Sequence, residues 1–394
     1  MRVLVLSHKP PYPIVDGGCL AMTRFLMDLS ETPRIEHIDY VTLSTHKHPF
    51  EEKYYSDLTF TNVTFQGIEI DTTLKVFPAL KALLSGKSYH TKRFLSENVS
   101  RVLVEKLRSN AYDIVICESL FSAIYLPIIR AHFHGKIYYR SHNIEYRIWE
   151  DLATNEKNPM KAWYLRKLAA TLKKEELTIW KNIDQILSIS SSDEVFIQER
   201  TNKKTLHVPS SMPEQNRKIE WTNERLCFLG AFDWEPNVEA VKWLVHEVFP
   251  RVLENNPRIE LHIAGRKCEL LPDEINGKNI HIHGFAADPL QFMAENGIFV
   301  AGLQSGSGIK MKVMEAMSIG VPCVLTTKAA EGLRFQDDMP IHANAQEFIS
   351  DVLLLISDVD KQQERGNMGK EYIQSAFSSQ IVRELLQKEF MSID

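Results

Sequence analysis

The chain has 394 residues, which is enough for two or three domains of about 150 residues each. Its composition, with 44% hydrophobic and 25% charged residues, is that of a folded globular protein, and a net charge of −5 gives no general attraction to nucleic acid. The five scattered cysteines form no CxxC pair, which indicates free thiols in a reducing compartment. We expect a cytoplasmic protein, because no secretory signal is visible and no apolar run approaches the ~20 residues that span a bilayer.

The N-terminal segment predicts a strand, a loop and a helix. Residues 2–7 are apolar enough for a buried strand, residues 8–18 form a loop rich in proline and glycine, and residues 19–29 have the apolar spacing of a helix. The Gly17-Gly18 pair ends the loop, and two glycines after a strand are by themselves more often just a turn. They lack the spacing of a GxGxxG fingerprint, which argues against an NAD-dependent enzyme.

Residues 37–43 and 63–70 predict further strands, and a basic segment follows them. Between residues 75 and 108 there are eight lysines and arginines against two glutamates, with apolar side chains interleaved. This mixture fits basic amphipathic helices that lie on an anionic lipid surface. It fits equally well the solvated basic face of a helix packed within the protein, so both interpretations stay open.

The first half continues as alternating strands and helices. Strands are predicted at residues 113–117, 136–140, 184–189 and 205–208, and helices at 121–129 and 163–180. The strand at 136–140 ends in SHNIEYRIWE, which we interpret as a loop that carries His142, Asn143 and Glu145. Residues 209–222 are polar, lack periodicity and contain two prolines, so we predict a linker between domains there.

The second half restarts the pattern, with strands at 225–229, 260–264 and 279–283 and helices at 238–253 and 289–296. Alternating histidines, which could bind a metal, occur in three places: His46/His48, His132/His134 and His281/His283. No carboxylate or cysteine stands at ligand spacing beside any of these pairs, so we expect structural or surface roles and no metal site. Residues 345–390 predict helices.

One stretch, residues 298–333, carries the strongest functional signal. It predicts a strand at 298–303, a loop of small residues at 304–308, a helix at 309–319 that ends at Gly320, and a strand at 321–326. In parallel α/β sheets such a loop lies at the carboxyl end of the strands, where ligands bind.

The polar residues of this predicted helix fit a nucleotide diphosphate. Gly308, Lys312 and Glu315 fall at i, i+4 and i+7 and share one stripe, with Lys310 in the first turn. The free N–H groups of a helix start and two lysines favour an anion, and a carboxylate one turn further in can accept hydrogen bonds from a ribose. The alternative is a buried helix whose solvated edge carries an internal Lys–Glu pair.

The stretch GSGIKMKVMEA resembles the donor-binding segment of family 4 glycosyltransferases, which are retaining enzymes of the GT-B fold that take a sugar from a nucleotide diphosphate. The family signature is a glutamate, seven residues and a second glutamate. Glu315 matches the second one, which the resemblance assigns to the nucleotide ribose. Ser307 stands where the family has its first glutamate, which contacts the donor sugar, and this departure resembles one branch of the family.

The resemblance implies roles for further residues around the donor. The Gly17-Gly18 pair would let the backbone approach the donor phosphates and the acceptor, and His142 would contact the donor sugar or its phosphate. Many relatives hold the diphosphate with an Arg and a Lys that this chain lacks after residue 229, so Lys310 and Lys312 would supply that charge. Arg266 is a weaker candidate for the diphosphate. Other donor-binding candidates are Gly284, Phe285, Ser307, Gly308, Ile309 and Glu331.

The fold that the resemblance implies is α/β, with two doubly wound Rossmann-like domains that face each other across a cleft. Residues 1–208 would form the acceptor-side domain, residues 209–224 the linker and residues 225–376 the nucleotide-sugar-binding domain. We expect residues 377–394 to form a helix that packs back on the N-terminal domain.

The implied function is retaining transfer of a sugar to a carbohydrate acceptor, which in the family is often lipid-linked, with His142, Lys312 and Glu315 as the catalytic residues. The nucleotide sugar is a substrate, so we expect no cofactor and no metal, and residues 75–108 would place the protein on the inner face of a membrane. A nucleotide-sugar epimerase on the same fold is one alternative. A catalytically silent nucleotide-sugar-binding protein is another, which Ser307 keeps open.

Overall fold

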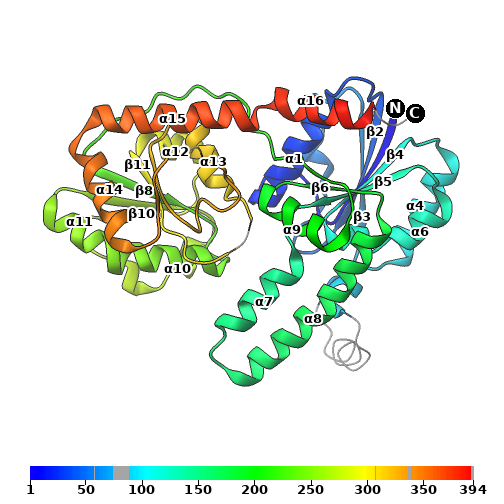
Figure 1. The fold of residues 1–394 in the computed structure, drawn as a ribbon, viewed down its shortest axis with the longest axis horizontal. Coiled ribbons are helices and arrows are strands. Elements are labelled where there is room, and N and C mark those ends of the chain that lie inside the picture. Colours follow the sequence, from blue (N-terminus) through cyan, green and yellow to red (C-terminus); the bar gives the residue numbers. More distant parts are fainter. Residues whose placement is uncertain (57, 74–87, 307, 336–338, 392–394) are drawn as a thin grey trace. The chain divides into compact units, whose positions relative to one another are not determined.

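The computed structural model describes residues 1–56, 58–73, 88–306, 308–335 and 339–391. The chain divides into two compact units, of which the first comprises residues 1–210 and 382–394 and the second residues 211–381. Each unit is a parallel β-sheet with helices on both of its faces (Figure 1). The predicted α/β fold with two Rossmann-like domains is therefore confirmed. Most of the predicted linker, from residue 211 onward, belongs to the second unit.

The first unit is built on a seven-stranded sheet in the order β3-β2-β1-β4-β5-β6-β7. Every neighbouring pair is parallel, so all carboxyl ends lie at one edge. The strands are short and apolar, as expected for a sheet that is covered on both faces. They span Arg2–Ser7 (β1), His37–Ser44 (β2), Val63–Glu69 (β3), Ile114–Glu118 (β4), Lys136–Ser141 (β5), Gln185–Ser188 (β6) and Thr205–His207 (β7).

The helices of the first unit differ from prediction where local chemistry intervenes. The expected helix at 121–129 is two helices, because Pro127 lacks the N–H that would continue the first one. The expected loop after β5 is mostly helix, since α7 begins at Glu145. The helices are α1 Gly17–Ser30, α3 Tyr89–Lys92, α4 Glu97–Ser109, α5 Leu120–Ala123, α6 Leu126–His132, α7 Glu145–Asn155, α8 Pro159–Asn182 and α9 Ser191–Thr201, with a 3-10 turn η1 at Glu52–Tyr54.

The basic segment at 75–108 is only partly described, because residues 74–87 lie outside the described residues. Within helix α4 the apolar side chains Val99, Leu103 and Leu107 are buried in the core of the first unit. This helix therefore turns its apolar face to its own protein, which favours the packed-helix interpretation for residues 97–109. No helix among the described residues combines the length and the apolar character that crossing a bilayer requires.

Helix α16, Ser379–Phe390, completes the core of the first unit although it lies far away in sequence. Val382, Leu386 and Phe390 are fully buried beside the side chains of β1, β2 and β4. Phe390 packs edge-on against Tyr138 of β5, and the hydroxyl of Tyr138 donates a hydrogen bond to Glu389 over 3.0 Å. The C-terminal helix thus belongs to the N-terminal unit by its packing.

The second unit has a six-stranded parallel sheet in the order β10-β9-β8-β11-β12-β13. Its core includes Phe228 and Phe299, whose rings stack on neighbouring strands. The strands span Arg225–Leu229 (β8), Glu260–Ala264 (β9), Ile280–Ile282 (β10), Ile298–Ala301 (β11), Cys323–Thr326 (β12) and Ile341–His342 (β13).

The helix expected at 238–253 begins earlier, at Glu235, and is interrupted by a π-helical turn. The turn precedes Pro250, which has no N–H to donate to the preceding turn. The helices of the second unit are α10 Glu235–Trp243, the π-turn η2 Leu244–Val248, α11 Phe249–Asn255, α12 Pro289–Glu295, α13 Met311–Ser318, α14 Ala345–Ser357 and α15 Val359–Phe377, with 3-10 turns η3 Cys268–Leu270 and η4 Asp273–Ile275. All five cysteines are free and buried.

Candidate functional site

In the first unit, a buried group of charged side chains lies where β4 and β5 end. His142 follows β5, and its Nε2 contacts Oε2 of Glu118, the last residue of β4. The other carboxylate oxygen of Glu118 lies 3.8 Å from Nε of Arg140, whose guanidinium sits over the ring of Phe25. Glu118 and Arg140 are fully buried and His142 nearly so. The carboxylate therefore fixes the orientation of the imidazole, and the arginine offsets the cost of burying that carboxylate.

A second histidine lies beside this group. His8 follows β1, its Nδ1 is 2.8 Å from Oγ of Ser119, and its ring meets that of His142 edge-on at 6.4 Å between centroids. Burial, together with the nearby Lys9 charge, lowers the pKa of His8 well below its usual value, so His8 is neutral at pH 7. Ser119 has φ = 79°, a conformation that costs a non-glycine residue about 1–3 kcal/mol and that clusters at functional sites.

The predicted Gly17-Gly18 pair lies at the start of helix α1 and not in the preceding loop. Asp16 caps this helix by accepting a hydrogen bond from the N–H of Cys19, and it holds Nζ of Lys9 at 2.7 Å. Burial alone would raise the pKa of Asp16, but the Lys9 charge and the hydrogen bonds outweigh it and keep the carboxylate ionised. A Cβ at Gly18 would lie 3.0 Å from Lys9 Nζ, so a larger residue there would require the lysine side chain to shift.

Glu145 opens helix α7 at the same edge of the first sheet. Its backbone N–H and that of Tyr146 donate to Glu176 of α8, over 3.2 and 3.0 Å. Desolvation by the surrounding protein raises the pKa of Glu145 to about 7, although Lys9 opposes that change. A carboxyl group that titrates near neutral pH and is only partly covered is a candidate functional residue. The sequence analysis placed this residue only in a loop.

A pocket of about 190 Å³ lies in the first unit, beside the start of helix α1. Its walls come from the loop after β1 and from residues that follow β2. They include Tyr12, Cys19, Lys47 and His48. Because the loops after β1 and β2 both leave the carboxyl edge of the sheet, the pocket opens at the edge where ligands bind in parallel α/β folds.

In the second unit, two loops at the carboxyl edge of the sheet approach each other closely. Gly265 follows β9 with φ = 143°, and a Cβ there would lie 1.7 Å from the carbonyl oxygen of Gly230, which follows β8. The N–H of Gly265 donates to the carbonyl of Gly284, which follows β10, over 2.8 Å. Because these glycines have no side chains, the loops that follow β8, β9 and β10 can pack against one another. Their backbone N–H and carbonyl groups therefore converge at the carboxyl edge of the sheet.

The start of helix α13 differs from the prediction, because the helix begins at Met311. Gly306 and Gly308 have φ = 92° and 77°, values that do not continue into a helix. Gly308 and Ile309 therefore precede the helix, and the predicted stripe from Gly308 to Glu315 is wrong at its first position. Lys310 is the N-cap residue, and no side chain caps the helix there. The first N–H groups of α13 are thus available to an anion.

Two lysines of this segment, Lys310 and Lys312, form ion pairs with glutamates that the sequence analysis assigned to the donor site. Lys312 Nζ lies 2.6 Å from Glu315, one turn along α13, and the two side chains are 36% and 12% exposed. Lys310 donates to the carbonyl of Gly308 over 2.6 Å and lies 3.7 Å from Glu331, which also pairs with Lys328. Four of the predicted donor residues, Lys310, Lys312, Glu315 and Glu331, are therefore brought into two ion-paired groups. Each group holds at least one partly exposed ammonium at the carboxyl edge.

The other predicted donor residues of the second unit follow neighbouring strands. Arg266 follows β9 and pairs with Asp233 over 3.0 Å. Gly284 has open space around it, and the side chain of Phe285 is 74% exposed, which suits a flat ligand surface. Ser307 lies outside the described residues.

Sequence reasoning missed Glu118, Arg140 and His8, which surround His142. Glu118 and Arg140 each come directly after a run of apolar and aromatic strand residues, and a charge at the end of such a run is the signal that could have found them. The histidine of the first loop is a weaker signal, because only the strand order shows that β1 and β4 are adjacent.

Comparison with protein families gives a match that lies within the second unit. Residues 223–358 match the family model described as "Glycosyl transferases group 1". The chain is 26% identical over 344 residues to an uncharacterised 44.6 kDa protein in the cps region of Klebsiella pneumoniae, and the match covers 84% of both chains.

Solved structures share the fold over the whole chain. A mutant of TarM from S. aureus, crystallised with fondaparinux, α-GlcNAc-glycerol and UDP, has a TM-score of 0.68 at 12% identity and covers 99% of both chains. Sucrose-phosphate synthase from Thermosynechococcus elongatus has a TM-score of 0.67 at 14% identity and covers 100% of this chain and 99% of its own. The family match therefore lies within the second unit, and the likeness to these structures shows that the chain shares their GT-B fold.

Proposed function

We propose, from the premise that this chain is a glycosyltransferase of the GT-B fold, that it moves a sugar from a nucleotide-diphosphate sugar to a carbohydrate acceptor with retention of configuration. The observation that carries the proposal is the start of α13, where uncapped N–H groups, Lys310, Lys312 and Glu315 lie at the carboxyl edge of the second sheet.

The second unit would bind the donor by exchanging ion pairs. The Lys312–Glu315 and Lys310–Glu331 pairs are partly exposed, and such pairs contribute little to stability. A diphosphate can therefore take the place of the carboxylates at the lysines at small cost and gain charge-assisted hydrogen bonds. Glu315, released from Lys312, would then accept hydrogen bonds from the ribose. The exposed ring of Phe285 offers a surface to the base.

The first unit would supply the histidine of the reaction. When the bond between the anomeric carbon and the diphosphate breaks, negative charge grows on the departing oxygen. An imidazole that is already oriented by a buried carboxylate can donate a hydrogen bond to that charge without reorganising. His142, held by Glu118, meets this requirement. The pocket of about 190 Å³ in the same unit, lined by the loops after β1 and β2, is the place we assign to the acceptor.

The lysines and the helix N–H groups neutralise the leaving diphosphate in this scheme, so the donor site needs no metal ion. We place the reaction in the cytoplasm, where nucleotide sugars are made, and assign it to polysaccharide biosynthesis because the Klebsiella relative lies in a cps region. The carbohydrate ligands crystallised with TarM support a carbohydrate acceptor. A lipid-linked acceptor would bring the protein to the inner face of the membrane.

The test begins with a panel of nucleotide sugars scored by thermal shift. A ligand that binds only the folded state raises the melting temperature with its occupancy, so the correct donor should stand out. Incubation of that donor with oligosaccharide acceptors should release the nucleoside diphosphate and give a product with the anomeric configuration of the donor, as measured by NMR. Lys242→Ala serves as the control for Lys312→Ala, because the two lysines are 41% and 36% exposed and Lys242 also pairs with a glutamate, Glu274, on the same unit.

The other two functions predict different products. An epimerase would convert the donor into an isomeric sugar without an acceptor. A silent binding protein would show the thermal shift without any turnover. An inverted product, or a Lys312→Ala variant that binds the donor as tightly as the wild type, would refute the scheme.

A further inference from the structure

Four polar side chains lie together on one face of the second sheet. Glu260 and His262 are two residues apart on β9, so both point to the same face, and His281 and His283 repeat this spacing at β10. The register pairs His262 with His281 directly across the two strands. Since β10 is the edge strand, the cluster lies at the border of the sheet.

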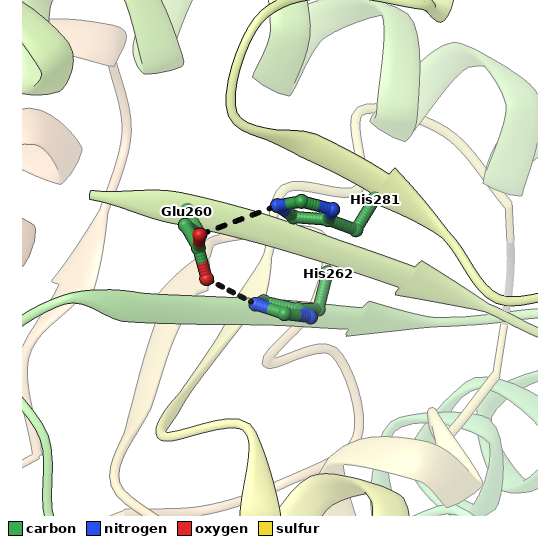
Figure 2. Close-up of side chains that lie close together, drawn as sticks. All are labelled: Glu260, His262 and His281. Carbon is green, nitrogen blue, oxygen red and sulfur yellow. Dashed lines mark hydrogen bonds and ion pairs between the residues drawn. The ribbon is translucent and has the colours of Figure 1, made fainter. Parts of the chain in front are cut away.

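The cluster converges on one carboxylate. Nε2 of His262 lies 3.2 Å from one oxygen of Glu260, and Nε2 of His281 lies 3.4 Å from the other. Figure 2 shows both rings pointing toward that carboxylate, and their stacked centroids are 4.9 Å apart. One ligand atom from each of the three residues lies within 4.8 Å of the others.

These atoms suit a transition-metal ion. Imidazole nitrogen and carboxylate oxygen bind Zn²⁺ at about 2.0–2.2 Å, so ligand atoms around a tetrahedral ion lie about 3.3 Å apart. The contacts from Glu260 to His262 and His281 already have this length. Side chains of Glu260 and His281 are 43% and 46% exposed, so they can rotate inward and an ion can enter from solvent. We propose that Glu260, His262 and His281 form a binding site for a divalent transition-metal ion of the Zn²⁺ class.

His283 acts as a positioning residue for this site. Its Nε2 lies 2.9 Å from Nδ1 of His262. When a metal takes the lone pair on Nε2 of His262, the ring proton must sit on Nδ1, where it can be donated to His283. Partners of this kind fix the tautomer and the ring orientation of a ligating histidine. Three protein ligands leave a fourth coordination position for water or another small ligand.

This site could not be recognised from the sequence alone. His281 and His283 were considered as possible ligands, but no carboxylate stands near them in the chain. Glu260 and His262 precede them by about twenty residues and reach them only through the parallel register of β9 and β10. The sequence analysis found no carboxylate close to this histidine pair along the chain. In the folded protein, however, Glu260 lies beside His281, so the expectation that the pair lacks a carboxylate partner is wrong.

Metal binding by the full-length chain tests the proposal. Protein stripped with a chelator and dialysed should bind one Zn²⁺ in calorimetry, with elemental analysis giving the same stoichiometry after gel filtration. Co²⁺ at the same site should show the visible absorption of a low-coordinate ion. Glu260→Gln and His281→Asn change half-exposed side chains, so both variants should fold, and each should weaken Zn²⁺ binding at least tenfold.

Two further variants separate this site from general histidine binding. His283→Asn should weaken Zn²⁺ binding about ten- to a hundredfold, as loss of such partners does elsewhere. His134→Asn changes an exposed histidine of the other unit and should leave the affinity unchanged. The proposal is overturned if wild-type protein binds no saturating equivalent of Zn²⁺, or if Glu260→Gln and His281→Asn bind it as tightly as wild type. Neither readout depends on transferase activity.

Discussion

The carboxyl edges of the two sheets place their charges in opposite ways. In the first unit Glu118, Arg140 and His142 are buried, and their geometry is fixed before any ligand arrives. In the second unit Lys312 and its partner are partly exposed on the first turns of a helix. The buried group resembles a preorganised catalytic apparatus, whereas the exposed pairs resemble a binding surface whose partners can be exchanged.

This difference suggests that the first unit carries out the chemistry and that the second unit binds the donor. Buried charges cost stability, so they persist where their orientation matters for chemistry. Exposed ion pairs cost almost nothing, so they can be arranged to receive a polyanion that varies in shape. Four changes can break or sharpen this contrast, and they follow from the largest expected effect to the smallest.

Replacing the buried imidazole should have the largest effect. His142→Ala removes the hydrogen bond that we assign to the departing diphosphate, so kcat should fall about 10²–10⁴-fold. Donor affinity should change less than about threefold, because the interaction grows mainly in the transition state. Initial rates of nucleoside diphosphate release measure this, with His134→Ala as the control. Activity within about fivefold of wild type would remove His142 from the mechanism.

Removing the buried arginine should mainly affect folding. Arg140→Met leaves Glu118 buried with only His142 beside it, and breaking one partner of a buried pair costs about 3–5 kcal/mol. The matched control is Arg258→Met, because Arg258 is an exposed arginine that pairs with Glu224 over 2.9 Å. Denaturant unfolding should show less than about 1 kcal/mol for the control. A loss below about 1 kcal/mol for Arg140→Met would mean that the buried group is not electrostatically coupled.

The carboxyl group of Glu145 should make the stability of the first unit depend on pH. Its folded pKa of about 7 lies above the ordinary value of 4.5, so the folded state binds more protons than the unfolded state between these values. Its contribution is therefore complete below about pH 4.5 and is lost as the pH rises through 7. Glu145→Gln cannot ionise, so its stability relative to wild type should rise by up to about 3 kcal/mol over this range. Melting curves at several pH values test this, and a constant difference would contradict it.

The Lys312–Glu315 pair, in which the lysine is 36% and the glutamate 12% exposed, should give the smallest effect on the free energy of unfolding and a measurable one on donor binding. Lys312→Ala should raise the donor Kd about 10–100-fold, because a charge-assisted hydrogen bond contributes roughly 1.5–3 kcal/mol. Its stability should change by less than about 1 kcal/mol. Calorimetry with the donor measures the first quantity and thermal unfolding the second. A large loss of stability with unchanged Kd would show that the pair is structural, as the alternative interpretation of this helix holds.

The alternation of strands and helices could be predicted because each strand is a short apolar run between loop residues. Residues 2–7, 225–229 and 260–264 were predicted with the bounds that the structure shows. Boundaries failed where one residue changes the backbone, as Pro127 and Pro250 do in helices and Gly308 does before α13. Such effects depend on single hydrogen bonds or dihedral angles, which periodicity does not report.

The donor segment was predictable because its residues are neighbours in sequence and one helix brings Lys312 and Glu315 together. The group around His142 was not, because Glu118 and His8 come from strands that are adjacent only through the order of the sheet. The cluster around Glu260 was missed for the same reason. Sites on one element can be found from spacing, whereas sites across strands need the register.

The position of helix α16 has a consequence for how the protein is made. Val382, Leu386 and Phe390 fill the core of a unit that otherwise ends at residue 210, so a nascent chain must wait for about 170 intervening residues before that core is complete. Until these residues are available, the core of the first unit lacks the three side chains that α16 contributes. Any truncation or tag near Phe390 will therefore disturb the opposite terminus of the polypeptide first.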